Sequence, residues 1–194
     1  MSYLNKYQWE LIPENLPKVE RGCPKCNKKT YYINSEKFRV NANKNNIDVW
    51  MIYQCEKCKS IWNMTIYERI KPHEINKYEY EKFISNSKEL VRKYAFDISI
   101  YNANKADYCL KNINYKMIIK KLEKFYIEEN MLVIEVISNY PIEMRIDKFI
   151  SDKFGISRSK IKNMHKKGQI FIKNNKNTLD ARIRNGMELH LKII

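Results

Sequence analysis

Cys23-Pro24-Lys25-Cys26 and Cys55-Glu56-Lys57-Cys58 are two cysteine pairs of identical C-x2-C spacing, and 28 residues separate them. Zinc prefers four soft thiolate ligands in a tetrahedron, with Zn–S distances of about 2.3 Å. A C-x2-C turn aims two sulfur atoms at one point. Asn27, directly after the first pair, tolerates the left-handed backbone that such turns often need. The spacing therefore predicts that Cys23, Cys26, Cys55 and Cys58 hold one structural zinc ion.

Two other interpretations of these cysteines stay open. The four thiols could form two disulfides, although a reducing cytosol opposes them. One pair could instead be a redox motif, although no βαβ pattern surrounds either pair. The fifth cysteine, Cys109, is expected to be a small buried apolar residue.

Strand-like patterns surround both cysteine pairs. The segments 31–33, 38–40, 48–54 and 61–67 are rich in apolar and aromatic residues that alternate as in strands, and a polar turn lies at 43–46. A unit of about 50 residues is too small for a self-sufficient core, so we expect the metal to stabilise it. Trp50, Trp62 and Tyr67 are expected to cover the sheet, and stacking on nucleic-acid bases is the alternative.

The flanking segments are less distinctive. Residues 1–20 are interpreted as an extended arm that packs its aromatic side chains against the ribbon. Residues 75–104 have helical periodicity, interrupted at Ser85-Asn86-Ser87, while 113–121 and 131–138 resemble strands. Residues 120–129 fit a helix or a strand equally well.

The pattern changes after the linker Asn139-Tyr140-Pro141. Two helices are expected, the first over 146–154 and ended by Gly155, the second over 158–167 and capped by Ser157. Strands are expected at 169–173 and 188–193. On the second helix, Arg158, Lys162, His165 and Lys166 fall within one arc of about 100° and form a basic stripe suited to phosphates.

The chain carries a net charge of +15, which indicates a polyanionic partner. Its 29 Lys against 8 Arg are also typical of an AT-rich genome, so part of the charge has no functional meaning. The distribution is more informative, because residues 141–194 hold 13 basic and 5 acidic residues, a net +8. The basic character is concentrated in the last quarter.

Other function classes find little support in the sequence. No apolar run approaches the roughly 20 residues that span a bilayer, and the first 14 residues lack the apolar centre of a secretory signal. We therefore expect a cytoplasmic protein. His73, His165 and His190 lie in no hydrolase motif, and four glycines leave no phosphate-binding loop. The sequence favours a non-catalytic protein, since four cysteine ligands leave zinc no open position for water.

Residues 145–191 resemble the RNA-binding domain named after ribosomal small-subunit protein four. The matching segments are Arg145–Ile150, Gly155–Ser159, Lys167–Ile172 and Asn185–Leu189. This resemblance implies two short helices on a small antiparallel sheet, with RNA contacts from Arg145, Ser157, Arg158, Lys162 and Lys166. One departure is the turn after the first strand, where Lys173-Asn174-Asn175 replaces the usual V-N-G.

Most of the chain resembles a bacterial family of unknown function, domain of unknown function 1062. The similarity rests on the CPKC turn, on 35–43, on 48–53 and on 62–69. It implies no activity.

Together these features predict an α+β protein in three segments. Residues 1–70 would form a zinc-ribbon-like antiparallel sheet with an N-terminal arm, 71–140 a region of helices and strands, and 141–194 a basic two-helix module with a small sheet. The predicted function is binding of structured RNA, such as ribosomal or transfer RNA. The alternatives are a protein-interaction adaptor, a DNA-binding protein and an RNA-modifying enzyme.

Overall fold

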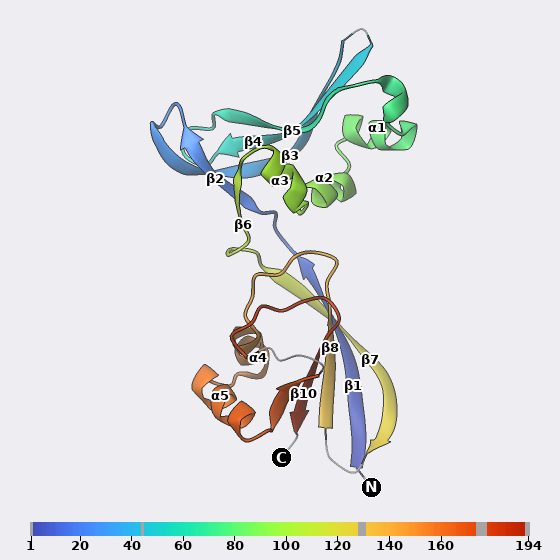
Figure 1. Ribbon diagram of the computed structural model, residues 1–194, viewed down its shortest axis with the longest axis vertical. Coiled ribbons are helices and arrows are strands. Elements are labelled where there is room, and N and C mark those ends of the chain that lie inside the picture. Colours follow the sequence, from blue (N-terminus) through green and yellow to red (C-terminus); the bar gives the residue numbers. More distant parts are fainter. Residues whose placement is uncertain (1, 44, 128–130, 174–177, 193–194) are drawn as a thin grey trace. The chain divides into compact units, whose positions relative to one another are not determined.

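The computed structural model describes residues 2–43, 45–127, 131–173 and 178–192. Within these residues the fold is α+β, with two mostly antiparallel five-stranded sheets and five α-helices (Figure 1). Contacts divide the chain into unit 1, formed by Met1–Glu14 with Asn114–Ile194, and unit 2, formed by Asn15–Ile113. Two predicted turns lie partly outside the described residues. These are the polar turn at 43–46, which contains Lys44, and the turn that differs from V-N-G, which contains Asn174 and Asn175.

The sheet of unit 2 has the strand order β5-β4-β3-β2-β6, with every neighbouring pair antiparallel. Its strands are β2 (Lys18–Cys23), β3 (Lys28–Asn43), β4 (Asn46–Cys55), β5 (Ile61–Ile70) and β6 (Asp107–Cys109). The strands expected from 31 to 67 are confirmed. A register shift between Asn34 and Phe38 separates the two predicted pieces that β3 joins.

Three helices and a 3-10 turn lie between β5 and β6 in the chain: η1 (Pro72–Glu74), α1 (Lys77–Ile84), α2 (Lys88–Ala95) and α3 (Ile98–Ala103). The predicted break between helices is confirmed, since Asn86 adopts a left-handed φ of 52° between α1 and α2. Asn76 caps α1 by accepting a hydrogen bond from the backbone N–H of Tyr78, and Asp97 caps α3 in the same way.

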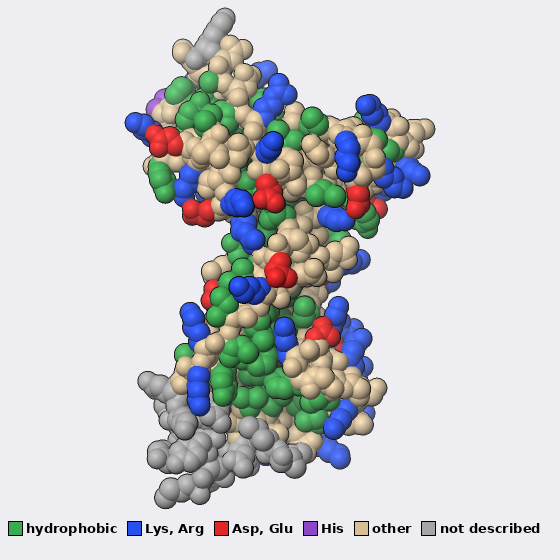
Figure 2. Space-filling model, turned by 180° about the vertical axis from the view of Figure 1, so that it is seen from behind, with side chains coloured by type: hydrophobic (Ala, Val, Ile, Leu, Met, Phe, Trp, Pro, Cys, Tyr) green, Lys and Arg blue, Asp and Glu red, His purple; other side chains and the backbone are tan. Residues whose placement is uncertain are grey.

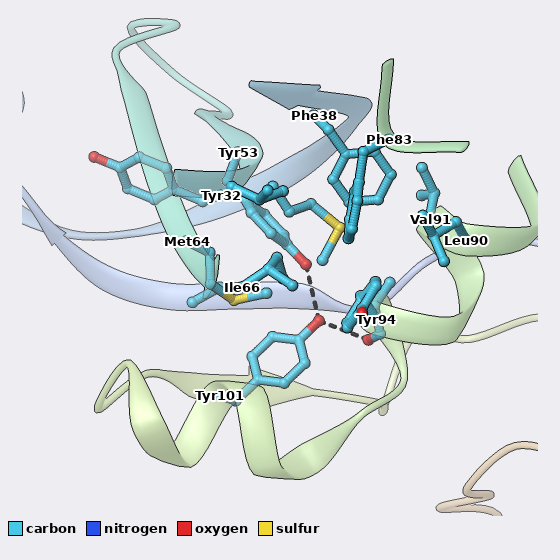
Figure 3. Packing of buried hydrophobic residues seen from close by; sticks show 14 of the residues in the cluster. Tyr32, Phe38, Tyr53, Met64, Ile66, Phe83, Leu90, Val91, Tyr94 and Tyr101 are labelled. Carbon is cyan, nitrogen blue, oxygen red and sulfur yellow. Dashed lines mark hydrogen bonds between the residues drawn. The ribbon is translucent and has the colours of Figure 1, made fainter. Parts of the chain in front are cut away.

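The helices of unit 2 bury one face of its sheet. Val49, Met51, Tyr53 and Cys55 alternate along β4 and are fully buried, and they pack in one cluster with Phe83, Val91 and Tyr101 (Figure 3). The Tyr53 and Tyr101 hydroxyls lie 2.8 Å apart, and that of Tyr101 donates to the Ala95 carbonyl at 2.6 Å. The unit is larger than the ribbon of about 50 residues expected from the sequence, and its helices supply much of the core.

The sheet of unit 1 has the order β7-β1-β8-β10-β9. Its strands are β1 (Ser2–Pro13), β7 (Tyr115–Ile127), β8 (Met131–Ile137), β9 (Ile170–Ile172) and β10 (Met187–Lys192), and its helices are α4 (Ile146–Phe154) and α5 (Arg158–Lys166). The pair β1–β8 is parallel, whereas the other pairs are antiparallel. The ambiguous segment after Lys120 continues β7 as a strand up to Ile127.

The expected N-terminal arm against the ribbon is wrong for residues 2–13. They form β1, which hydrogen-bonds to β7 on one side and to β8 on the other. Trp9 is buried, with its ring 5.7 Å from that of Phe149 and 5.6 Å from that of Phe154, both on α4. The aromatic residues of this segment therefore belong to the core of unit 1.

The helices of the described residues are short. None of them is long and apolar enough to span a membrane.

Candidate metal centre and basic helix

The two cysteine pairs occupy equivalent turns at one end of the unit 2 sheet. Cys23 ends β2 before β3 begins at Lys28, and Cys55 ends β4 before β5 begins at Ile61. The residue after the second cysteine has a left-handed backbone in both turns, with φ 50° at Asn27 and 61° at Lys59. The predicted conformation of Asn27 is confirmed, and Lys59 repeats it.

The four sulfur atoms form one cluster, in which all lie within 4.8 Å of one another. The Cys23 and Cys58 sulfurs are 3.5 Å apart, and those of Cys26 and Cys55 are 3.9 Å apart. A tetrahedral ion with bonds of about 2.3 Å places its sulfur ligands ~3.8 Å apart, whereas a disulfide needs about 2.05 Å. All five cysteines are free thiols. The cluster could therefore hold one metal ion.

Hydroxyl groups surround the sulfur atoms. Ser60 Oγ lies 3.3 Å from the Cys23 sulfur and 3.2 Å from that of Cys58, and Thr30 Oγ1 lies 3.3 Å from that of Cys55. When the sulfurs are thiolates, the Thr30 hydroxyl can donate to Cys55, whereas the single hydroxyl proton of Ser60 can be donated to only one of its two sulfur neighbours at a time. Such outer contacts orient the ligands and spread their negative charge.

The pKa values of two of the clustered thiols are shifted in opposite directions. The hydrogen bond with Ser60, followed by that with Tyr32, lowers the pKa of Cys23 to about 5. The hydrogen bond with Cys58 and burial raise the pKa of Cys26 to about 12. The charge of Cys23 adds a smaller effect that also raises the pKa of Cys26, and a bound cation would act in the opposite direction.

Arg21 brings a positive charge to the same end of the sheet. Its guanidinium carbon lies 4.1 Å from the centre of the Trp62 ring and 5.6 Å from that of Tyr32. Burial lowers the pKa of Arg21, while Tyr32 and Cys23 raise it through their charges.

Trp62 and Tyr67 lie on the buried face as expected, with the Tyr67 hydroxyl bonded to Glu79 at 3.2 Å.

The predicted RNA-contact residues gather around α4 and α5 in unit 1. Asp147 is fully buried and accepts hydrogen bonds from Arg145 at 3.0 and 3.1 Å and from Arg158 at 2.7 and 2.9 Å. Arg145 also contacts Asp180. Burial acts to raise the pKa of Asp147, but the hydrogen bonds from the two arginines prevail and lower it. Both arginines therefore have a structural role.

Two further predicted residues also have partners within the chain. The Ser157 hydroxyl caps α5 by accepting from the backbone N–H of Lys160 at 3.3 Å, as expected. His165 Nδ1 lies 2.8 Å from the Ile170 carbonyl oxygen, which ties α5 to β9.

The remaining two predicted residues, Lys162 and Lys166, are exposed and form no ion pair within the described part of the chain. Lys160 and Lys167 are also exposed. They lie outside the basic stripe predicted from the sequence. The density of lysine between 160 and 167 could have indicated them in the sequence. Most of α5 is accessible, since Ile161 is its one buried residue.

The family model described as a protein of unknown function (DUF1062) matches residues 40–176. The chain belongs to this family. The match contains Cys55 and Cys58 together with α4 and α5, while Cys23 and Cys26 precede it. The comparisons with curated proteins and with solved structures gave no match.

Proposed function

We propose that this protein binds structured RNA without catalysis, through the exposed lysines of α5, and that its cysteine cluster holds a structural zinc ion. The observation that carries the RNA proposal is the set of exposed lysines on α5 that have no acidic partner among the described residues. It contrasts with the arginines beside it, which the buried Asp147 engages.

The order of elements in unit 1 supports this proposal. The elements α4, α5, β9 and β10 follow one another as in the RNA-binding domain that residues 145–191 resemble. Gly155 ends α4 with a left-handed φ of 64°, so the chain turns directly into α5. Asp147 then fixes the start of α5 through Arg158. The helix is held firmly while its outer side stays free for a ligand.

The charge of this surface is the second support. Figure 2 shows Lys and Arg side chains gathered along the edge of unit 1 on which α4 and α5 lie. Each lysine that neutralises a phosphate releases counterions, so affinity falls as salt rises. A rigid helix with several such lysines suits the regular phosphate spacing of a stem, and phosphate contacts alone would also admit DNA.

Zinc fits the donor set better than other common metals. Tetrahedral thiolate sites select zinc or iron–sulfur clusters, whereas calcium and magnesium take oxygen ligands. Four protein ligands complete the coordination of zinc and leave no position for water, which suits a structural role. When bound, the ion would cross-link the β2–β3 and β4–β5 turns.

The test is the salt dependence of binding to a fluorescein-labelled RNA hairpin, measured by anisotropy between 50 and 300 mM KCl. The double variant Lys162→Glu/Lys166→Glu is expected to bind at least tenfold more weakly and to lower the slope of log affinity against log salt by roughly two.

The matched control is Lys77→Glu/Lys88→Glu. Both of these lysines are exposed at the first position of a helix in unit 2, so the change in net charge is the same. The control variant should bind nearly as well as the unaltered protein. Equal losses in the two double variants would reject α5 as the binding surface. Co-purification of a protein partner that stays bound after nuclease treatment would favour the adaptor instead.

A further inference from the structure

Among the residues that the structure describes, no helix covers one face of the unit 2 sheet. The buried cluster contains the residues on the side of Met51 and Tyr53 together with residues of α1, α2 and α3. The alternate residues of β3, β4 and β5 point to the opposite side, where Ile33, Gln54 and Ile61 form one row across the three strands. Ile61 is 63% exposed and Ile33 39% exposed. The described residues therefore leave this face open.

Two aromatic rings stand on the open face, each beside a cation. Tyr31 is 38% exposed, with Lys18 Nζ 5.9 Å from the centre of its ring. Trp50 is half-buried and pairs in register with Arg39, whose guanidinium carbon lies 5.9 Å from its ring. The structure thus separates Trp50 from Trp62 and Tyr67, whose rings belong to the opposite, helix-covered side.

The spacing of the two rings fits a chain-like ligand. The Tyr31 carbonyl accepts a hydrogen bond from the N–H of Glu56, so Tyr31 is level with the end of β4. Glu56 is six positions beyond Trp50, a distance of about 20 Å along an extended strand. Ile33, Ile52 and Gln54 occupy the interval. The surface between the rings is long enough for several nucleotides.

The charge at the Tyr31 end of this face is strongly positive. Residues 18–31 and 54–61 contain 7 Lys or Arg and 2 Glu. One of these acids, Glu56, pairs with Lys18 at 3.1 Å. The lysines of the two cysteine turns and of the start of β3 are exposed, and they are Lys25, Lys57 and Lys59 in the turns and Lys28 and Lys29 on β3. A polyanion complements such a rim.

We propose that this open face of unit 2 binds a single-stranded segment of RNA, with bases stacked on Tyr31 and Trp50 and phosphates beside the lysines of the cysteine turns. Aromatic side chains combined with cations are the usual platform for single strands, because unpaired bases expose their flat faces. A duplex hides these faces. This surface lies in the other unit from α5 and binds a different form of the polymer, so it goes beyond the function proposed above.

The test uses the full-length protein and a fluorescein-labelled 12-nucleotide oligouridine. Tyr31→Ala is expected to weaken its binding by about tenfold, the typical effect of losing one stacked base. Tyr78→Ala is the matched control, because Tyr78 is 66% exposed and has Lys82 Nζ 4.4 Å from its ring, but lies on α1. The control should bind as well as the unaltered protein. Equal affinities of the two variants for oligouridine would overturn the inference.

Two further measurements separate this surface from α5. Oligouridine should quench part of the tryptophan fluorescence. Trp50→Phe should abolish this quenching, because Trp9 and Trp62 lie on the buried sides of their sheets. Lys162→Glu/Lys166→Glu should leave oligouridine binding within about twofold. If this double variant abolishes oligouridine binding while Tyr31→Ala leaves it intact, the single strand binds at α5, and the inference fails while the proposed function stands.

Discussion

Arg158 Nη2 donates to Asp147 Oδ2 at 2.7 Å, and this carboxylate is fully buried although Arg158 itself is half exposed. Arg145 donates to the same carboxylate from the N-cap position of α4. The first turn of α4 and the first residue of α5 are thereby joined through one acid. Arg158, which the sequence predicts to contact RNA, also links the two helices.

Replacing Asp147 by Asn should destabilise unit 1. The amide cannot match the charge of two guanidinium groups, so we expect the free energy of unfolding to fall by about 2–3 kcal/mol, somewhat less than for a fully buried pair because both arginines reach solvent. Urea unfolding followed by tryptophan fluorescence measures this. Asp152→Asn, an exposed acid on the same helix, is the control and should change stability by less than about 0.5 kcal/mol.

The same carboxylate predicts a pH dependence. The pKa of Asp147 is lower in the folded protein than its ordinary value of 3.8. Its contribution to stability is therefore complete above that value and is lost as the pH falls through the lower, folded pKa. The stability difference between Asp147→Asn and the unaltered protein should shrink below about pH 4. A difference that stays constant between pH 6 and pH 3 would contradict this account.

Removal of the metal should loosen one end of unit 2 and leave its core folded. Elemental analysis of the reduced protein should find one zinc per chain. Cys23 and Cys55 belong to the same cluster as Phe83 and Tyr101, but most of its buried residues come from the strands and from α1, α2 and α3, so chelation should preserve most of the helical circular dichroism. It should expose Cys23 and Cys55 to a thiol reagent that does not reach them in the loaded protein. Complete unfolding on chelation would show that the ion holds the whole unit.

Tyr101→Phe should lower the stability of unit 2 by about 1–2 kcal/mol. The change removes a hydrogen bond to the Ala95 carbonyl and the one shared with the Tyr53 hydroxyl, both in a buried site. Burial raises the pKa of Tyr53 to about 12. Because its neutral hydroxyl is buried, it needs a hydrogen-bond partner within the protein. Tyr78→Phe, at an exposed hydroxyl, should be neutral. Thermal unfolding of the two variants compares them, and a neutral Tyr101→Phe would contradict the structural account.

The sequence allowed the local features of this molecule to be predicted. The cysteine pairs lie in turns whose geometry depends on four or five residues, and the left-handed Asn27 follows from its residue type. Both helices of 146–167 follow from apolar periodicity, with Ser157 and Gly155 at their ends. Each of these features is decided within a few positions along the chain, so an analysis of spacing can find it.

Long-range pairing could not be predicted in this way. β1 pairs with a segment more than 100 residues away, and nothing in its residues specifies β7 or β8 as its neighbours. The role of Asp147 is a similar case. An acid in the first turn of a helix is normally a solvated residue, and only the approach of Arg158 from the next helix makes it the centre of a buried network.

The placement of β1 leads to the last prediction. Trp9 lies between the rings of Phe149 and Phe154 in the core of unit 1, while its Nε1–H has no hydrogen-bond acceptor among the described residues. Trp9→Ala should therefore cost about 3–4 kcal/mol through the cavity it leaves. Trp9→Phe should cost about 1 kcal/mol, because it keeps the stacking and removes the unsatisfied donor. Urea unfolding of both variants, followed by circular dichroism, gives the two values. If Trp9→Ala is neutral, the first strand is a peripheral arm after all, and the central position of β1 is wrong.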